Sequence, residues 1–125
     1  MVEISTKLLP PDVVAHLCVE NWKLTGAMRK AIDILPDADG RRLTGQLNFS
    51  IRQLSMLVDK LGFKLVEFDG EAFHTGLAAS ADNAEDYAED VKLVVVKTLE
   101  PTVMADMKII RLGRVLVEPV DSGKE

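Results

Sequence analysis

Residues 57–68 read Leu57-Val58-Asp59-Lys60-Leu61-Gly62-Phe63-Lys64-Leu65-Val66-Glu67-Phe68, and the pattern of the chain changes at the Leu61-Gly62 join. Before this join, apolar residues recur at helical spacing. After it, short β-branched runs alternate with glycine, proline and acidic loops. The sequence therefore predicts an α+β fold with a helical region at residues 1–62, a small β-domain at 63–120 and a frayed tail at 121–125.

Length and composition limit what this chain can build. With 125 residues, 47% of them hydrophobic, it can form one modest domain or two very small layers. A β-domain of about 60 residues buries too little surface to be more than marginally stable alone. The marginal stability of so small a domain favours self-association of the chain.

Charge is distributed unevenly along the chain. The net charge is -5. Residues 1–62 carry 8 Lys/Arg and 7 Asp/Glu, whereas residues 63–125 carry 7 and 13. An acidic C-terminal half disfavours nucleic acid, because phosphate binding needs a basic surface. It is better suited to a basic surface on a protein partner.

Cysteine usage and hydropathy indicate the compartment. Cys18 is the single cysteine and cannot form an internal disulfide, which suits a reducing environment. The N-terminus has no basic segment followed by an apolar core, and no apolar run approaches the roughly 18 residues of a membrane span. We expect a cytoplasmic protein with no membrane contact.

The first helix is predicted to open at Pro10-Pro11-Asp12 and to run to Leu35, where Pro36 stops it. Its apolar residues are spaced alternately by three and four, as in a coiled coil or helical bundle. This seam comprises Val14, Leu17, Asn21, Leu24, Met28, Ala31 and Leu35. Asn21 can fix the register of a parallel pair. The alternative, an ordinary amphipathic helix with Asn21 at its edge, stays open.

A turn at residues 36–40 leads to a second predicted helix that ends at Gly62 as its C-cap. One face of this helix carries Leu43, Leu47, Ile51, Leu54, Val58 and Leu61. Since the first helix also has apolar residues off its seam, the hairpin has more apolar surface than it can cover. We therefore expect a dimeric four-helix bundle. The expected dimerisation residues are Val14, Leu17, Asn21, Leu24, Met28, Leu47, Leu54 and Leu61.

Four strands are predicted after the join, at residues 63–68, 91–99, 107–110 and 114–117. Asp69-Gly70 is a strong turn dipeptide, and Pro101 ends the second strand. Gly113 is expected to form a turn or bulge before the last strand. Residues 71–90 are predicted to be loop-like.

Catalytic and metal-binding patterns are weak. The acidic stretch at residues 82–90 lacks the alternating ligands, sixth-position glycine and twelfth-position glutamate of an EF-hand, so a solvated acidic loop or short helix is the better interpretation. His74 lies near Asp69 and Glu71 in the sequence, which could suggest a metal or acid-base site. The other histidine, His16, is on the first helix, so no second ligand stands at a readable spacing. No serine or threonine has a nucleophile-elbow or phosphate-loop context. We expect a protein that is not an enzyme, with no metal and no cofactor.

Three stretches resemble the GrpE family, the nucleotide exchange factors of DnaK-type chaperones, over roughly residues 34–117. They are Ile34-Leu35-Pro36-Asp37; Leu54 to Gly62 with Leu65 and Gly70-Glu71-Ala72-Phe73; and Gly113-Arg114-Val115-Leu116. The resemblance implies a parallel dimer with a four-helix bundle and a β-domain that binds a DnaK-type ATPase and promotes ADP release. In such a protein Phe73, Arg111 and Arg114 would contact the partner.

The chain also departs from the pattern of that family. The long N-terminal helix is reduced to some 25 residues, and Val117-Glu118-Pro119 stands where the family has arginine-proline-alanine. The alternative is a dimeric structural adaptor that uses a GrpE-like scaffold to bind a different protein.

Overall fold

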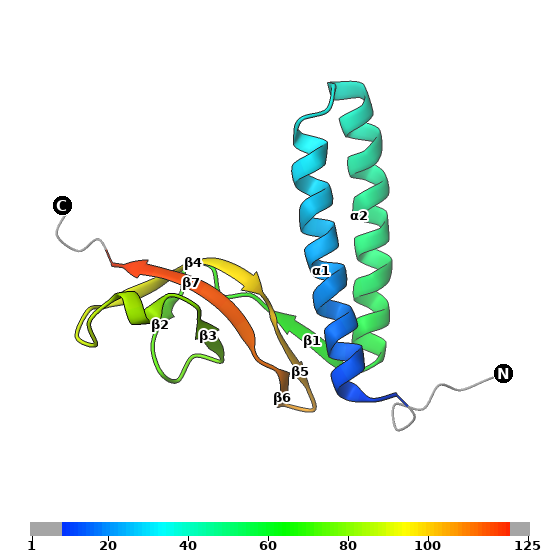
Figure 1. Cartoon of the computed structure of the whole chain (residues 1–125). Helices are drawn as coiled ribbons and strands as arrows, with labels where there is room; N and C mark the ends of the chain where they lie inside the picture. Colours follow the sequence, from blue (N-terminus) through cyan, green and yellow to red (C-terminus); the bar gives the residue numbers. More distant parts are fainter. Residues whose placement is uncertain (1–8, 121–125) are drawn as a thin grey trace. The chain divides into compact units, whose positions relative to one another are not determined.

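The computed structural model describes residues 9–120 (Figure 1). The predicted tail at residues 121–125 and the N-terminal residues 1–8 lie outside this range. Two helices precede a curled β-region, so the α+β class is confirmed. The chain divides into two compact units, one up to Lys64 and one from Leu65.

Helix α1 spans Pro11–Asp33. Pro11 occupies the first helical turn, where its missing N–H costs nothing, and Asp12 lies near the positive end of the helix dipole. The helix ends two residues before the predicted Leu35. The N–H of Ile34 closes the last turn on Ala31 O at 3.3 Å, and the N–H of Leu35 bonds Ile32 O at 3.0 Å.

Helix α2 spans Asp37–Lys60, so the predicted turn at residues 36–40 is wrong for four of its residues. Pro36 is extended, and the helix starts at once with Asp37 and Asp39 in its first turn. The same acids that are typical of turns also stabilise a helix N-terminus. Gly40 is buried where α2 passes Ile32 of α1.

The end of α2 agrees with the sequence pattern. Leu61 caps the helix, and Gly62 has a φ of 80°, a left-handed conformation that glycine adopts without strain. The N–H of Gly62 bonds Asp59 O at 2.9 Å. The C-cap is therefore Leu61, and the predicted Gly62 lies one residue beyond it.

Helices α1 and α2 lie side by side as an antiparallel hairpin (Figure 1). The buried residues of α1 are Ala15, Val19 and Ile32. Arg29 Nη2 donates to Asn48 Oδ1 across the two helices at 3.3 Å. The stripe that packs within the chain is therefore different from the predicted seam.

The β-unit contains two sheets. Strand order is β2-β4-β7-β3 in the larger sheet and β1-β5-β6 in the smaller. The strands are β1 Phe63–Val66, β2 Ala72–Phe73, β3 Ala79–Ala81, β4 Leu93–Glu100, β5 Thr102–Ala105, β6 Lys108–Arg111 and β7 Gly113–Pro119, with a 3-10 turn η2 at Ala84–Asp86. Strand β3 pairs with β7 in parallel, while the β2–β4, β4–β7 and β5–β6 pairs are antiparallel.

The core of the β-unit follows the two-residue period of its strands. Val115 and Val117 of β7 are fully buried, whereas Arg114 and Glu118 are exposed. The two valines form one cluster with Phe68, Ala79 and Val95. Alternate burial thus positions the charged side chains of β7 on the outside.

The observed strands differ from the predicted ones in their bounds and in number. Strand β4 begins two residues after the predicted Val91, and β1 ends before Phe68, which still packs in the core. The prediction of Met107 as a strand residue is wrong, because it lies in a turn. Strands β2, β3 and β5 were not predicted, since runs of two, three and four residues are too short to give a readable period.

A sharp corner joins the two sheets at buried Pro101, between β4 and β5. Gly113 is the first residue of β7 rather than a turn or bulge. A Cβ at Gly113 would lie 2.5 Å from Glu100 O and 2.6 Å from Thr102 N. The hydroxyl of Thr102 accepts the N–H of Gly113 at 2.8 Å and donates to Ala78 O. Glycine is required because the backbones touch.

Candidate functional site

The two arginines predicted to contact a partner meet around one carboxylate. Arg111 Nη2 lies 3.4 Å from Glu100 Oε1, and Arg114 Nη1 lies 3.3 Å from Glu100 Oε2. Glu100 ends β4 and is only 5% exposed, whereas both arginines reach the surface from β6 and β7. Glu100 is thus the centre of the cluster.

A second carboxylate holds Arg114 from the acidic stretch. Arg114 Nη2 lies 2.8 Å from Asp82 Oδ2, and its Nε bonds the same carboxylate at 3.2 Å. This bidentate pair lowers the pKa of Asp82 from its ordinary value and raises that of Arg114. One residue of the predicted solvated acidic loop is therefore bound to the sheet.

The geometry leaves this cluster electrically balanced. Two guanidinium groups face two carboxylates, so the surface is not a bare basic patch. Sequence reasoning missed Glu100 and Asp82. A charged residue at the end of an otherwise buried strand is the only signal that points to Glu100, because a buried charge needs partners.

Phe73 is not presented to solvent in the way that the GrpE resemblance implies. It lies in β2, is half-buried and packs against the cluster of Phe68, Val95 and Val117. The structure therefore brings Arg111 and Arg114 together and places Phe73, half-buried, against the core of the β-unit.

The predicted helical seam is mostly uncovered in a single chain. Leu17 is 70% exposed, Leu24 is 66% exposed, and Met28 is also exposed. Val14 and Asn21 are half-buried at the border with the stripe that packs on α2. Large apolar side chains rarely stay in water as a row, so this face is the strongest candidate for an interface.

The dimerisation residues predicted on α2 divide between two environments. Leu47 and Leu61 are half-buried, whereas Leu54 is 36% exposed and is not at the centre of the hairpin. Phe49, Met56 and Leu57, which were not among the predicted residues, are more exposed still. Both helices therefore carry exposed apolar residues.

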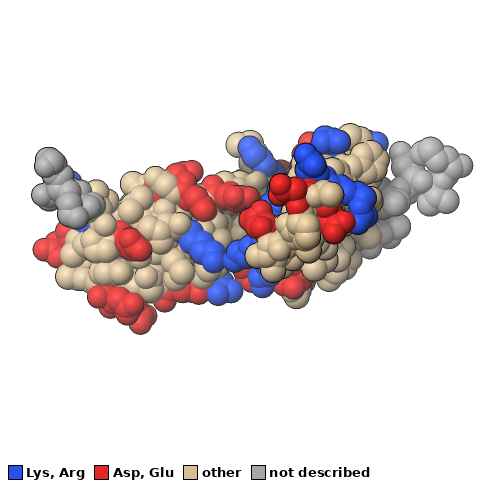
Figure 2. Space-filling view, turned by 90° about the horizontal axis from the view of Figure 1, so that it is seen from above, with Lys and Arg blue, Asp and Glu red and all other residues tan. Residues whose placement is uncertain are grey.

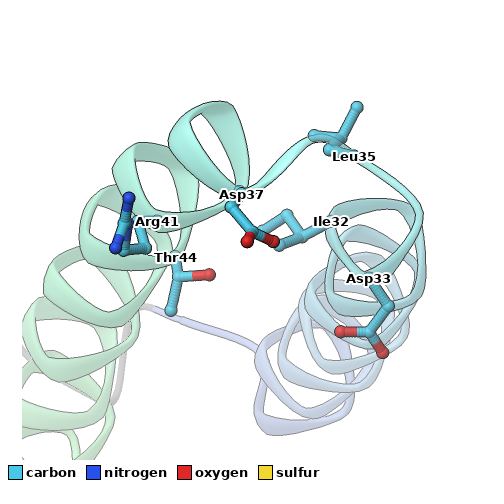
Figure 3. A pocket seen from close by; sticks show the side chains of 7 residues that line it. Ile32, Asp33, Leu35, Asp37, Arg41 and Thr44 are labelled. Atoms are coloured by element: carbon cyan, nitrogen blue, oxygen red, sulfur yellow. The ribbon is translucent and has the colours of Figure 1, made fainter.

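An open hollow of about 500 Å³ lies at the end of the hairpin where α1 meets α2. It is lined by Ile32, Asp33, Leu35, Asp37, Gly40, Arg41 and Thr44. Figure 3 shows Asp37 and Ile32 pointing toward one another, while Asp33 and Arg41 point apart. The charged groups do not converge on a point, and this arrangement provides no acid, base and nucleophile in mutual reach.

The remaining candidates have structural contacts. His74 Nδ1 accepts the N–H of Gly76 at 3.1 Å, and burial raises the pKa of the half-buried Cys18 thiol. Within residues 9–120, no group of three or more His, Cys, Asp or Glu side chains is placed to hold a metal ion. Neither of the two described helices is long and apolar enough to cross a bilayer.

On the face of the β-unit that Figure 2 shows, acidic side chains are spread among neutral ones and outnumber the basic ones. Residues 63–125 contain 13 Asp/Glu and 7 Lys/Arg, which matches this view. Comparison with known proteins found no matching family model, no similar curated protein and no similar solved structure.

Proposed function

We propose that this chain forms a cytoplasmic homodimer that acts as a GrpE-like nucleotide exchange factor for a DnaK-type chaperone. One observation carries the proposal: α1 packs on α2 through Ala15, Val19 and Ile32, while Leu17 and Leu24 stay exposed on another face. A helix that is apolar on two faces needs a second partner. A second copy supplies the same face and completes a four-helix bundle.

The proposed activity needs binding and no covalent chemistry. A protein that binds the open form of an ATPase more tightly than the ADP-bound form lowers the affinity for ADP by the same factor. This role agrees with a hairpin joined to a small β-unit and with the resemblance at residues 34–117. No metal or cofactor is required.

Within the β-unit, Arg111 and Arg114 are the proposed contacts with the ATPase. The side chains of Arg111 and Arg114 remain partly exposed, at 35% and 45%. Both are fixed by carboxylates, so they are pre-organised and lose little side-chain entropy on binding. Phe73, half-buried on the edge strand β2, packs against the core of the β-unit.

Stopped-flow release of a fluorescent ADP analogue from a DnaK-type chaperone of the same cell tests the activity. The protein should accelerate release, and Arg114→Ala should reduce that acceleration while Arg52→Ala, on the exposed part of α2, should not. Equal rates with and without the unmutated protein would reject the exchange function.

A dimeric structural adaptor for a different protein is the second candidate. The balanced Arg111–Glu100–Arg114–Asp82 cluster favours it, because paired charges attract a partner less than free ones do. A pull-down that recovers a protein other than a DnaK-type chaperone, together with unchanged ADP release, would support the adaptor.

A further inference from the structure

Arg114 is held by two carboxylates that lie in different environments. Glu100, at the end of β4, is 5% exposed, and its Oε2 lies 3.3 Å from Nη1 of Arg114. Asp82, just after β3, has a side chain that is 35% exposed and contacts the other two nitrogens of the guanidinium. The buried carboxylate is a fixed part of the β-unit, whereas the exposed one can exchange its contact with Arg114 for water.

Asp82 fills the edge of Arg114 that best fits a carboxylate. Its Oδ2 lies 2.8 Å from Nη2, and Nε bonds the same carboxylate at 3.2 Å. The paired Nε and Nη2 donors of a guanidinium match the two oxygens of a carboxylate. The other fork, Nη1 and Nη2, has one nitrogen on each acid. Both forks of Arg114 are therefore in use within the chain, and a carboxylate from outside needs the place of Asp82.

Only the side chain of Asp82 has to move to free this edge. The N–H of Asp82 bonds Val115 O at 2.9 Å, and the next residue, Asn83, is bonded to β7 through its own side chain. Neither contact involves the carboxylate of Asp82, so the segment stays on β7 when that carboxylate rotates away. Glu100 meanwhile keeps its contact with Nη1. Arg114 then stays in place with one edge open.

The exposed pair is easily opened. Ion pairs at the surface contribute little to stability, because water and salt screen the charges and both side chains lose freedom. Exchange of one carboxylate for another also preserves the charge-assisted hydrogen bonds of the guanidinium. Asp82 therefore lowers the affinity for an external carboxylate severalfold and does not block it.

We propose that the Nε–Nη2 edge of Arg114 is a carboxylate-binding site, which Asp82 occupies in the free chain and an acidic side chain of the ATPase occupies in the complex. Asp82 is then an internal competitor that weakens partner binding. The ATPase as partner rests on the proposed function, whereas the competition for Arg114 does not. A balanced cluster can still bind an acidic partner, because the partner replaces one of its two acids.

Acetate tests the competition without any partner protein. In ¹⁵N NMR spectra of the full chain, the Nε–H signal of Arg114 is followed as sodium acetate replaces sodium chloride at constant ionic strength. Acetate should shift this signal about threefold more in Asp82→Ala than in the unmutated chain. Asp82→Asn, which keeps the size of the side chain and loses the charge, should give an intermediate shift. Equal shifts in all three chains would overturn the proposal.

Asp86→Ala is the matched control. It removes an acid from the same segment, and within residues 9–120 the ion pairs of Arg114 are with Asp82 and Glu100 only. Its acetate response should equal that of the unmutated chain. A response as large as that of Asp82→Ala would show that loss of any nearby negative charge is sufficient, and would also overturn the proposal.

Binding of a DnaK-type chaperone then tests the partner. Asp82→Asn should bind the ADP-free chaperone about fivefold more tightly than the unmutated chain, whereas Asp86→Asn should change the affinity little. The gain should vanish in the background of Arg114→Ala, since both changes act on one contact. Intact binding with equal affinities for Asp82→Asn and the unmutated chain would overturn the proposal and leave the exchange function standing. No binding by any of these chains would reject the exchange function, and the acetate titration would still decide the competition.

Discussion

Gly113 shows how one position can determine a fold without any polar chemistry. It lies where the first residue of β7 crosses the corner at Pro101, against the backbone of Glu100 and Thr102. The sequence pattern predicted a turn or bulge at Gly113. Contact between two distant backbones has no periodic signal, so only the tertiary structure reveals the reason.

Gly113→Ala should destabilise the protein by about 1–3 kcal/mol, the usual cost of forcing an extra carbon into a packed site. The clashing atoms belong to the backbone of Glu100 and Thr102 and cannot move by a simple rotation. Urea unfolding measures the loss. Gly45→Ala is the control, because a Cβ there meets no atom within 4 Å. A loss below about 0.5 kcal/mol at Gly113 would contradict the crowded corner.

The Asp82–Arg114 pair predicts a specific dependence of stability on pH. The hydrogen bond from Arg114 lowers the pKa of Asp82 in the folded state. The pair therefore stabilises the fold at pH values above the ordinary pKa of aspartate. This contribution is lost as the pH falls through the lowered pKa of Asp82. The urea midpoint of the unmutated protein should exceed that of Asp82→Asn at pH 7, and the two should converge in strong acid. A constant difference across this range would show that the charge of Asp82 is irrelevant.

At the scale of elements, helix α1 carries one apolar face that is buried within the chain and another that is exposed. Heptad spacing predicted one of them, the face of Leu17 and Leu24, and the structure leaves it exposed. The face that packs within the chain uses Ala15 and Val19, residues off that seam. The spacing of apolar residues reveals an apolar helix face but not the element that covers it. A helix of the same chain and a helix of a second chain both require apolar residues at these positions.

Leu24→Asp should dissociate the proposed dimer, because two uncompensated charges would be buried in its interface. We expect the dissociation constant to rise about a hundredfold or more in sedimentation equilibrium. Leu24→Met keeps an apolar side chain of similar volume and should leave the dimer intact. A monomer at micromolar concentration in the unmutated protein would refute this interpretation of α1.

Strands were harder to predict than helices for a physical reason. The longer β4 and β7 have a readable alternation, whereas β2 and β3 contain two and three residues and are held by single partners. Asn83, just after β3, also depends on a distant segment. Its side chain bonds both the N–H and the C=O of Val117, at 3.0 and 2.9 Å. Such contacts between distant segments leave no local pattern.

For the whole molecule, two small units of about 60 residues each share one chain. Each has a limited core, so association of the helical unit would contribute a large part of its stability. If the chain is a dimer, its melting temperature must rise with protein concentration.

Calorimetry over a hundredfold range of concentration measures this effect, and Leu24→Asp should show none. A melting temperature that stays constant for the unmutated protein would indicate that the units are stable without a partner. This measurement needs no knowledge of the chaperone or of any other protein.

The Thr102 hydroxyl also bears on the rate at which the chain folds. It links Ala78 and Gly113, which are 24 and 11 residues away along the chain. Contacts of this kind form only after long loops have closed, whereas the hairpin of α1 and α2 needs only a short connection. Refolding followed by stopped-flow circular dichroism should therefore show helix signal returning first, with the β-unit following in a slower phase that Thr102→Val delays further.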